Sequence, residues 1–124
     1  MMYFTTIIDH TAGAGTSEIY VSLPIDARLN AVSLVPNMTT TAHASNYVTY
    51  NLKDNAAANI FTANTSTGSG ATLTGGTPVS VALLSSADLD FAAGEVCRLQ
   101  IVDSASGADA NLTVVWEFAP ARSV

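Results

Sequence analysis

Two histidines and one cysteine are the side chains of this chain best suited to metal binding or nucleophilic catalysis. His10 and His43 lie in separate turn-like segments, and neither has a second ligand nearby at the spacing of a metal site. Cys97 is the only cysteine, so neither an intrachain disulfide nor a multi-cysteine zinc site can form. We therefore expect both histidines to be solvated loop residues, and we expect no metal and no cofactor.

Acidic residues gather in two short segments, where they suggest either calcium binding or turn formation. Asp88, Asp90 and Glu95 are close in sequence, but the glycine and ligand positions of the calcium-binding loop of about twelve residues are missing. Asp103 and Asp109 flank small residues whose composition is typical of a hairpin connection, in which aspartates cap the turn. We interpret all five acids as turn-forming and solubilising residues.

Serine and glycine are frequent, but their arrangement matches neither a catalytic nor a phosphate-binding motif. A serine nucleophile needs a neighbouring base, and the chain has no G-x-S-x-G elbow to hold one at a strand-to-helix turn. The segments Gly13-Ala14-Gly15 and Gly75-Gly76 lack the lysine and the following helix of a phosphate loop. The sequence therefore predicts that the protein is not an enzyme.

The elements that must position these residues follow a period of two, which is typical of half-buried antiparallel strands. From Thr16 to Leu23, the residues Ile19, Val21 and Leu23 share one face, while Glu18, Tyr20 and Ser22 share the other. Pro24 then ends the strand because it lacks an N–H. Similar patterns, bounded by Gly, Pro, Asn and Asp, predict further strands at 3–8, 28–35, 46–52, 56–63, 77–84, 95–103 and 111–118.

About eight short strands at this spacing predict an all-β fold, a single antiparallel β-sandwich of jelly-roll type. The domain is expected to span 1–124, because 124 residues supply only one core, with 1–9 as an N-terminal arm or an edge strand. The alanine run at 56–58 leaves a short helix open as an alternative there. Glycines and small polar residues predict a loop from Thr65 to Gly76 with a mobile tip.

The chain has few charges for its size, 11% against roughly 25% in an average soluble domain. No apolar run reaches the roughly 20 residues of a membrane-spanning helix, and residues 1–9 lack the basic start of a cleaved signal, so we expect neither. With a net charge of -6 and scattered cations, no cluster can neutralise successive phosphates, and we expect no nucleic-acid binding. Since 48% of the residues are hydrophobic, other subunits are expected to cover part of the surface.

Aromatic and apolar residues outside the predicted core are the candidates for those subunit contacts. Tyr20 and Tyr47 fall on the strand faces opposite the main apolar stripes, and tyrosine is common at interfaces that are apolar at one end and wet at the other. The N-terminal strand contributes Tyr3, Phe4 and Ile7, since a terminal strand can extend the open sheet edge of a neighbour. We expect these five residues to lie at an interface.

Four stretches carry the strand sequences of this chain: IYVSLPIDARL at 19–29, AVSLVP at 31–36, DFAAGEV at 90–96 and LTVVWEF at 112–118. In length, composition and strand sequence the chain resembles the small virion proteins of tailed phages, with capsid decoration or cement proteins as the nearest type. The resemblance implies a jelly-roll or related β-sandwich, commonly a homotrimer, seated on the outer capsid surface with the major capsid protein as partner. It also implies synthesis in the host cytoplasm, no catalytic residues, and stabilisation of the shell by many modest contacts acting together.

Three other functions remain open from the sequence. A receptor-binding head-fibre or tail-associated β-sandwich module would hold a host glycan in the loops Thr65–Gly76 and Ser104–Ala110. A protein of the tail or of the head-to-tail connection would form a ring with few copies in each virion. A hydrolase on a jelly-roll scaffold would need a polar cluster that the sequence does not suggest, and the fold alone does not decide function.

Overall fold

The computed structural model describes residues 1–83 and 89–120, and within these ranges it contains eight β-strands and no α-helix. The strands are β1 (Met2–His10), β2 (Thr16–Ser22), β3 (Ala27–Pro36), β4 (Val48–Lys53), β5 (Asn59–Asn64), β6 (Asp90–Phe91), β7 (Val96–Asp103) and β8 (Ala110–Pro120). The prediction of an all-β, antiparallel β-sandwich with about eight strands is confirmed. No helix capable of crossing a membrane occurs in the described ranges.

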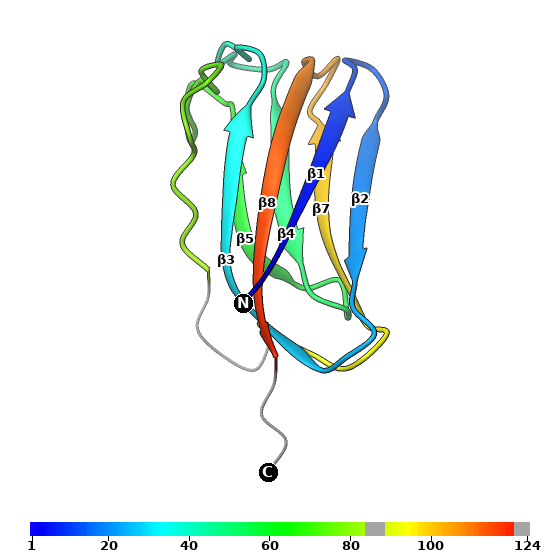
Figure 1. Cartoon of the computed structure of the whole chain (residues 1–124). Coiled ribbons are helices and arrows are strands. Elements are labelled where there is room, and N and C mark those ends of the chain that lie inside the picture. Colours follow the sequence, from blue (N-terminus) through cyan, green and yellow to red (C-terminus); the bar gives the residue numbers. More distant parts are fainter. Residues whose placement is uncertain (84–88, 121–124) are drawn as a thin grey trace.

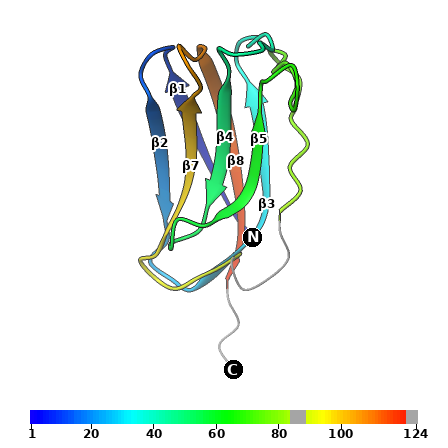
Figure 2. The same cartoon turned by 180° about the vertical axis from the view of Figure 1, so that it is seen from behind.

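Two four-stranded sheets form the two layers of the sandwich (Figure 1). Sheet A has the strand order β1-β8-β3-β6, and sheet B, in front in Figure 2, has the order β2-β7-β4-β5. Apart from the β4–β5 hairpin, each strand is followed in the chain by a strand of the opposite sheet. The connections therefore cross the ends of the sandwich, where they bring together segments that are far apart in sequence.

The core lies between the sheets and is built from alternate residues of the strands. In β8, Leu112, Val114, Trp116 and Phe118 point inward and are at most 1% exposed, as the alternating pattern predicts. The indole N–H of Trp116 donates to Thr6 Oγ1 at 2.9 Å, which satisfies the polar atom of this large buried side chain. Because β8 pairs with both β1 and β3, it holds sheet A together along its length.

The N-terminal residues form an edge strand of sheet A. All nine residues of β1 pair with β8, from Met2 opposite Phe118 to His10 opposite Ala110. The other edge of β1 has no strand partner in sheet A. An unpaired strand edge is a template for pairing with another chain.

One predicted strand is absent from the described part of the chain. At 77–83 the strand pairing is limited to an isolated bridge, in which Val79 N–H donates to Leu34 O at 2.8 Å. Pro78 has no N–H to give to a ladder, so Val79, Val81 and Leu83 pack against the core from irregular backbone. Leu84, the end of the predicted strand, and the predicted link from Ser85 lie outside the described residues until Leu89.

The other differences between the predicted and the observed strands are each confined to a few residues. The short strand β6 pairs with β3 and was not predicted, because two residues carry no periodic signal. The alanine run at 56–58 lies in the β4–β5 turn and not in a helix, and Ala57 has a φ of 65°.

The predicted loop from Thr65 to Gly76 has irregular backbone, but it is not a solvated segment throughout. Thr65, Ser66 and Leu73 are 0%, 8% and 3% exposed. Thr40 and Leu73 exchange two backbone hydrogen bonds, of 2.8 and 3.0 Å. Local composition does not predict this burial, because the covering residues come from a distant part of the chain.

Gly70 is the position in this loop where a side chain is least tolerated, because an added Cβ would overlap the backbone and side-chain oxygens of Asn64. We expect Gly70→Ala to lower the free energy of unfolding by about 2 kcal/mol, within the range for overpacking a tight site. Gly68→Ala is the matched control, since a Cβ there would lie at an ordinary 3.7 Å from Ser66 Oγ. Urea denaturation compares the two variants, and equal stabilities would contradict the loop structure.

Candidate functional site

The five predicted interface residues do not share one surface: four lie in three separate places on the outside of the sandwich, and Phe4 packs against the core. Tyr3 and Ile7 point outward from β1 and are 63% and 60% exposed. Tyr20 is 55% exposed on the outward side of sheet B. Tyr47 is half-buried before β4, where its carbonyl accepts from Ser104 N–H at 2.9 Å. Phe4 points toward the core, and its ring meets that of Phe118 edge to face with centroids 6.1 Å apart.

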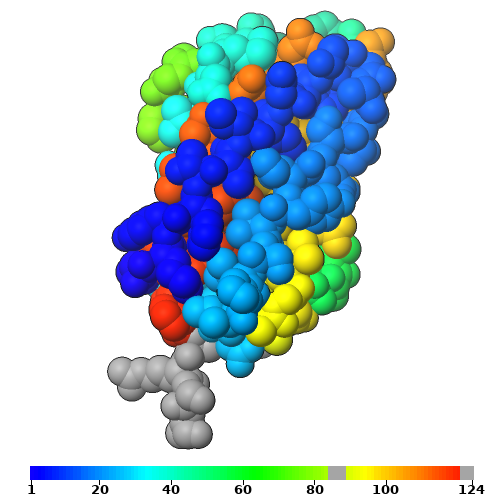
Figure 3. Space-filling view, turned by 45° about the vertical axis from the view of Figure 1, so that its right-hand side comes forward, coloured from blue at the N-terminus to red at the C-terminus, as the bar shows by residue number. Residues whose placement is uncertain are grey.

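Tyr3 and Ile7 belong to a broad outward surface of sheet A, here called the sheet A face. Strand register places three rows across β1, β8 and β3 in this face: Tyr3, Glu117 and Ala31; Thr5, Val115 and Ser33; Ile7, Thr113 and Val35. Figure 3 shows the N-terminal strand, in dark blue, as a continuous ridge along this side of the molecule.

The sheet A face carries a single charged residue among its nine positions, Glu117. Tyr3 donates its phenolic O–H to Glu117 Oε1 at 2.9 Å, and this hydrogen bond raises the pKa of Tyr3. Met1, which is 68% exposed, adds another apolar residue on the same side of the sandwich. A surface with so few charges and with large exposed apolar side chains is typical of an interaction surface.

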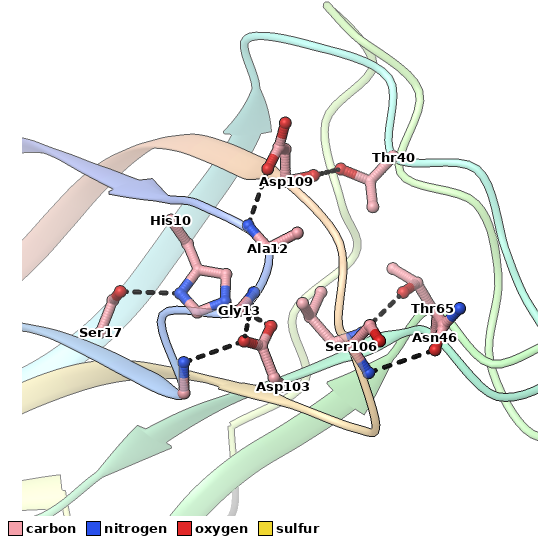
Figure 4. Close-up of polar contacts among 12 residues, drawn as sticks. His10, Ala12, Gly13, Ser17, Thr40, Asn46, Thr65, Asp103, Ser106 and Asp109 are labelled. Carbon is pink, nitrogen blue, oxygen red and sulfur yellow. Dashed lines mark hydrogen bonds and ion pairs between the residues drawn. The ribbon is translucent and has the colours of Figure 1, made fainter.

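A polar cluster at one end of the sandwich is the second notable site (Figure 4). His10 Nδ1 lies 2.7 Å from Ser17 Oγ, and His10 Nε2 lies 2.7 Å from Asp103 Oδ1. The side chains of His10 and Asp103 are 0% and 5% exposed. The prediction that His10 is a solvated loop residue is therefore wrong, because β1 continues to residue 10 and its alternation turns this side chain inward.

Asp103, at the end of β7, also binds the backbone of the connection between β1 and β2. Its Oδ2 accepts from the backbone N–H groups of Gly13 and Gly15, at 3.0 and 2.9 Å. Burial raises the pKa of this carboxyl, but the hydrogen bonds from His10 and from the two glycine amides outweigh burial and hold the pKa below its usual value. Asp109 supplements the link by accepting from Ala12 N–H at 2.7 Å. The β1–β2 connection is thus fixed to the end of β7 and to the β7–β8 connection.

Serine, histidine and aspartate in a row are also the components of a nucleophilic catalytic site, but their arrangement here favours a structural role. In catalytic triads the serine lies on Nε2 and the carboxylate on Nδ1, whereas His10 has these two partners exchanged. The imidazole has no exposed surface at which a substrate would meet it. The second carboxylate oxygen of Asp103 accepts hydrogen bonds from two backbone N–H groups. We interpret the cluster as a tie between loops.

The remaining candidates for chemistry have local partners. His43 is exposed, and its Nδ1 accepts from Ser45 N–H and Asn46 N–H, at 3.1 and 2.9 Å, so it caps a turn. Asp90 pairs with Arg28 at 2.8 Å, and Glu95 Oε1 accepts from Ala92 N–H at 2.7 Å. Asp88 lies outside the described residues.

Cysteine and metal chemistry have little support in the described ranges. Cys97 is 1% exposed, and burial raises its pKa to about 12, so the thiol is not activated. No three histidine, cysteine, aspartate or glutamate side chains of these ranges gather as metal ligands.

Comparisons with known proteins were made at three levels. Family models, curated proteins and solved structures give no match to this chain. The sheet A face and the polar cluster therefore have to be interpreted from their own chemistry.

Proposed function

We propose that this chain is a structural virion protein of a tailed phage, a head decoration or cement protein. It binds the outer capsid surface through the major capsid protein and stabilises the shell, and its working form is a homotrimer. The observation that carries this proposal is the sheet A face, where Tyr3 and Ile7 stand exposed on an edge strand beside seven positions that hold one charged residue, Glu117. The resemblance of the strand sequences to decoration proteins supplies the class of partner.

The strand pairing supports a jelly roll as the finer description of the sandwich. First and last strands pair, β1 with β8, and so do β2 with β7, β3 with β6, and β4 with β5. This is the pairing of a long antiparallel ribbon rolled up into two sheets, and eight-stranded jelly rolls are a recurrent architecture of viral capsid domains.

The proposal includes no catalytic step. The polar cluster around Asp103 fits the same purpose, since a protein that must resist tension benefits from loops tied by charge-assisted hydrogen bonds. Shell stabilisation would then come from many copies, each burying modest area against several subunits.

Ile7→Lys tests the proposal. The purified chain is mixed with head shells assembled from the cognate major capsid protein, and co-sedimentation measures binding. We expect the wild type to bind and Ile7→Lys to bind roughly tenfold more weakly or worse, because an ammonium placed in a dry contact loses its hydration. A deletion of residues 1–9 is less informative, since β1 is part of the fold.

Ile25→Lys is the matched control, because Ile25 is 43% exposed in the β2–β3 connection, away from the sheet A face. It is expected to bind like the wild type. Light scattering reports whether the shell-binding form is a trimer. Absence of wild-type binding, or equal binding by the two lysine variants, would overturn the proposal.

A further inference from the structure

The outward side of sheet B carries a row of polar side chains that crosses all four of its strands. In register from β2 to β5, the row consists of Glu18, Gln100, Asn51 and Thr62. Thr62 Oγ1 donates to Asn51 Oδ1 at 2.5 Å, and Gln100 Nε2 donates to Glu18 Oε1 at 2.8 Å. These bonds hold the amide and hydroxyl groups in fixed positions.

The adjacent row, Tyr20, Arg98 and Lys53, concentrates positive charge. Arg98 and Lys53 are direct cross-strand partners, and like charges in this arrangement destabilise a sheet. They are two of only four Lys and Arg residues in a chain with a net charge of -6. Glu18 Oε2 lies 3.7 Å from Arg98 Nη1 and offsets one of the two charges. The row therefore keeps a positive charge that an anion would complement.

Arg98 lies beside the exposed ring of Tyr20, whose hydroxyl donates to Glu18. Its Nε is buried and has no hydrogen-bond partner, which is unique among the buried side-chain nitrogen and oxygen atoms of residues 1–83 and 89–120. Its guanidinium lies 5.4 Å from the ring centroid of Tyr20, which is 55% exposed. Because Nε is buried, an incoming carboxylate would meet the terminal Nη groups of Arg98, and Nη1 is engaged by Glu18 only at 3.7 Å.

We propose that the row Tyr20, Arg98 and Lys53, together with Gln100, binds a saccharide that carries a carboxylate. Arg98 and Lys53 bind the carboxylate. The Tyr20 ring contacts the apolar face of the sugar. Gln100, whose amide is oriented by Glu18, hydrogen-bonds a sugar hydroxyl.

A saccharide fits this face better than an acidic protein does. Protein interfaces usually have an apolar centre. Here the two central rows offer the Tyr20 ring and otherwise polar or charged groups, and the outward valines of β7, Val96 and Val102, are half-buried at its two ends. The proposal does not depend on capsid binding, which uses the opposite sheet.

The test is a titration of the full chain, followed by amide chemical shifts, with trigalacturonic acid and with its methyl ester. The ester has the same rings but no charge, so it isolates the carboxylate. We expect the acid to bind with a Kd of about 1 mM or tighter and at least about tenfold more tightly than the ester, with shifts at Tyr20, Arg98 and Gln100.

Arg98→Gln is expected to weaken binding of the acid about tenfold, while Arg28→Gln, which changes an arginine of sheet A, binds like the wild type. If Arg98→Gln does not fold, as judged by circular dichroism, Lys53→Gln takes its place with the same expectation. Equal binding of acid and ester, or wild-type affinity in the folded variant, would overturn the proposal. So would equally tight binding of triglutamate, which would assign the face to an acidic protein.

Discussion

Asp103→Ala is expected to lower the free energy of unfolding by about 3 kcal/mol. The substitution removes the acceptor of three hydrogen bonds, from His10 and from the amides of Gly13 and Gly15. It also leaves Nε2 of His10 without its partner in a side chain that has no exposed surface. A buried donor left without an acceptor typically costs about 1–3 kcal/mol, and partial access of water to the two loop amides keeps the total near 3 kcal/mol.

Asp103→Asn is the matched control for the loss of the acceptor. The asparagine oxygen can keep the two glycine amides, and its NH₂ group can donate to His10 Nε2 once the imidazole proton moves to Nδ1 and faces Ser17. We therefore expect Asp103→Asn to cost only about 1 kcal/mol at neutral pH. Urea unfolding of the three proteins measures both differences, and an alanine variant as stable as the asparagine variant would contradict the tie between the loops.

The pH dependence gives a second measurement on the same residue. The pKa of Asp103 is lower in the folded protein than in the unfolded chain, so its carboxylate stabilises the fold above the unfolded pKa of about 4. This contribution is lost as the pH falls through the folded pKa. Asparagine does not titrate, so the difference between wild type and Asp103→Asn should be largest at neutral pH and should shrink in acid. A difference that stays constant down to pH 2 would show that the charge is not responsible.

The sequence predicted the strands best where the signal is local. β8 and β7 alternate without interruption and end at turn residues, so their inward residues, such as Trp116 and Leu99, were identified correctly. The segment at 77–83 alternates equally well, but alternation describes a packed face and not a hydrogen-bonded ladder. With Pro78 at its start, it packs on the core with one bridge.

The sites were harder to predict because they depend on register between distant segments. His10 and Asp103 are 93 residues apart, and nothing in either local sequence indicates the other. Extending the alternation of β1 by two residues would have indicated a buried histidine, but not its partners. The interface candidates were chosen one strand at a time, and only the sheet order separates Tyr3 on sheet A from Tyr20 on sheet B.

Gly107→Ala is expected to be as damaging as the loss of Asp103, at about 3 kcal/mol, although it removes no interaction. Gly107 has a φ of +66°, and an added Cβ would overlap the carboxylate of Asp103. The left-handed backbone costs a non-glycine residue about 1–2 kcal/mol, and the overlap adds about 1–3 kcal/mol because the hydrogen bonds of Asp103 prevent it from moving aside.

A control and a double variant separate these two contributions to the cost of Gly107→Ala. Gly76 has a φ of +79° and open space where a Cβ would lie, so Gly76→Ala should show the backbone cost alone. In an Asp103→Ala background the overlap with the carboxylate disappears and only a 2.8 Å approach to the Cβ of residue 103 remains, so Gly107→Ala should cost much less than in the wild type and little more than the Gly76 control. The expected coupling between positions 103 and 107 is about 2 kcal/mol, measured by a double-mutant cycle of urea unfolding. Additive effects would mean that the carboxylate does not occupy the space beside Gly107, and the loop tie would then have to be placed elsewhere.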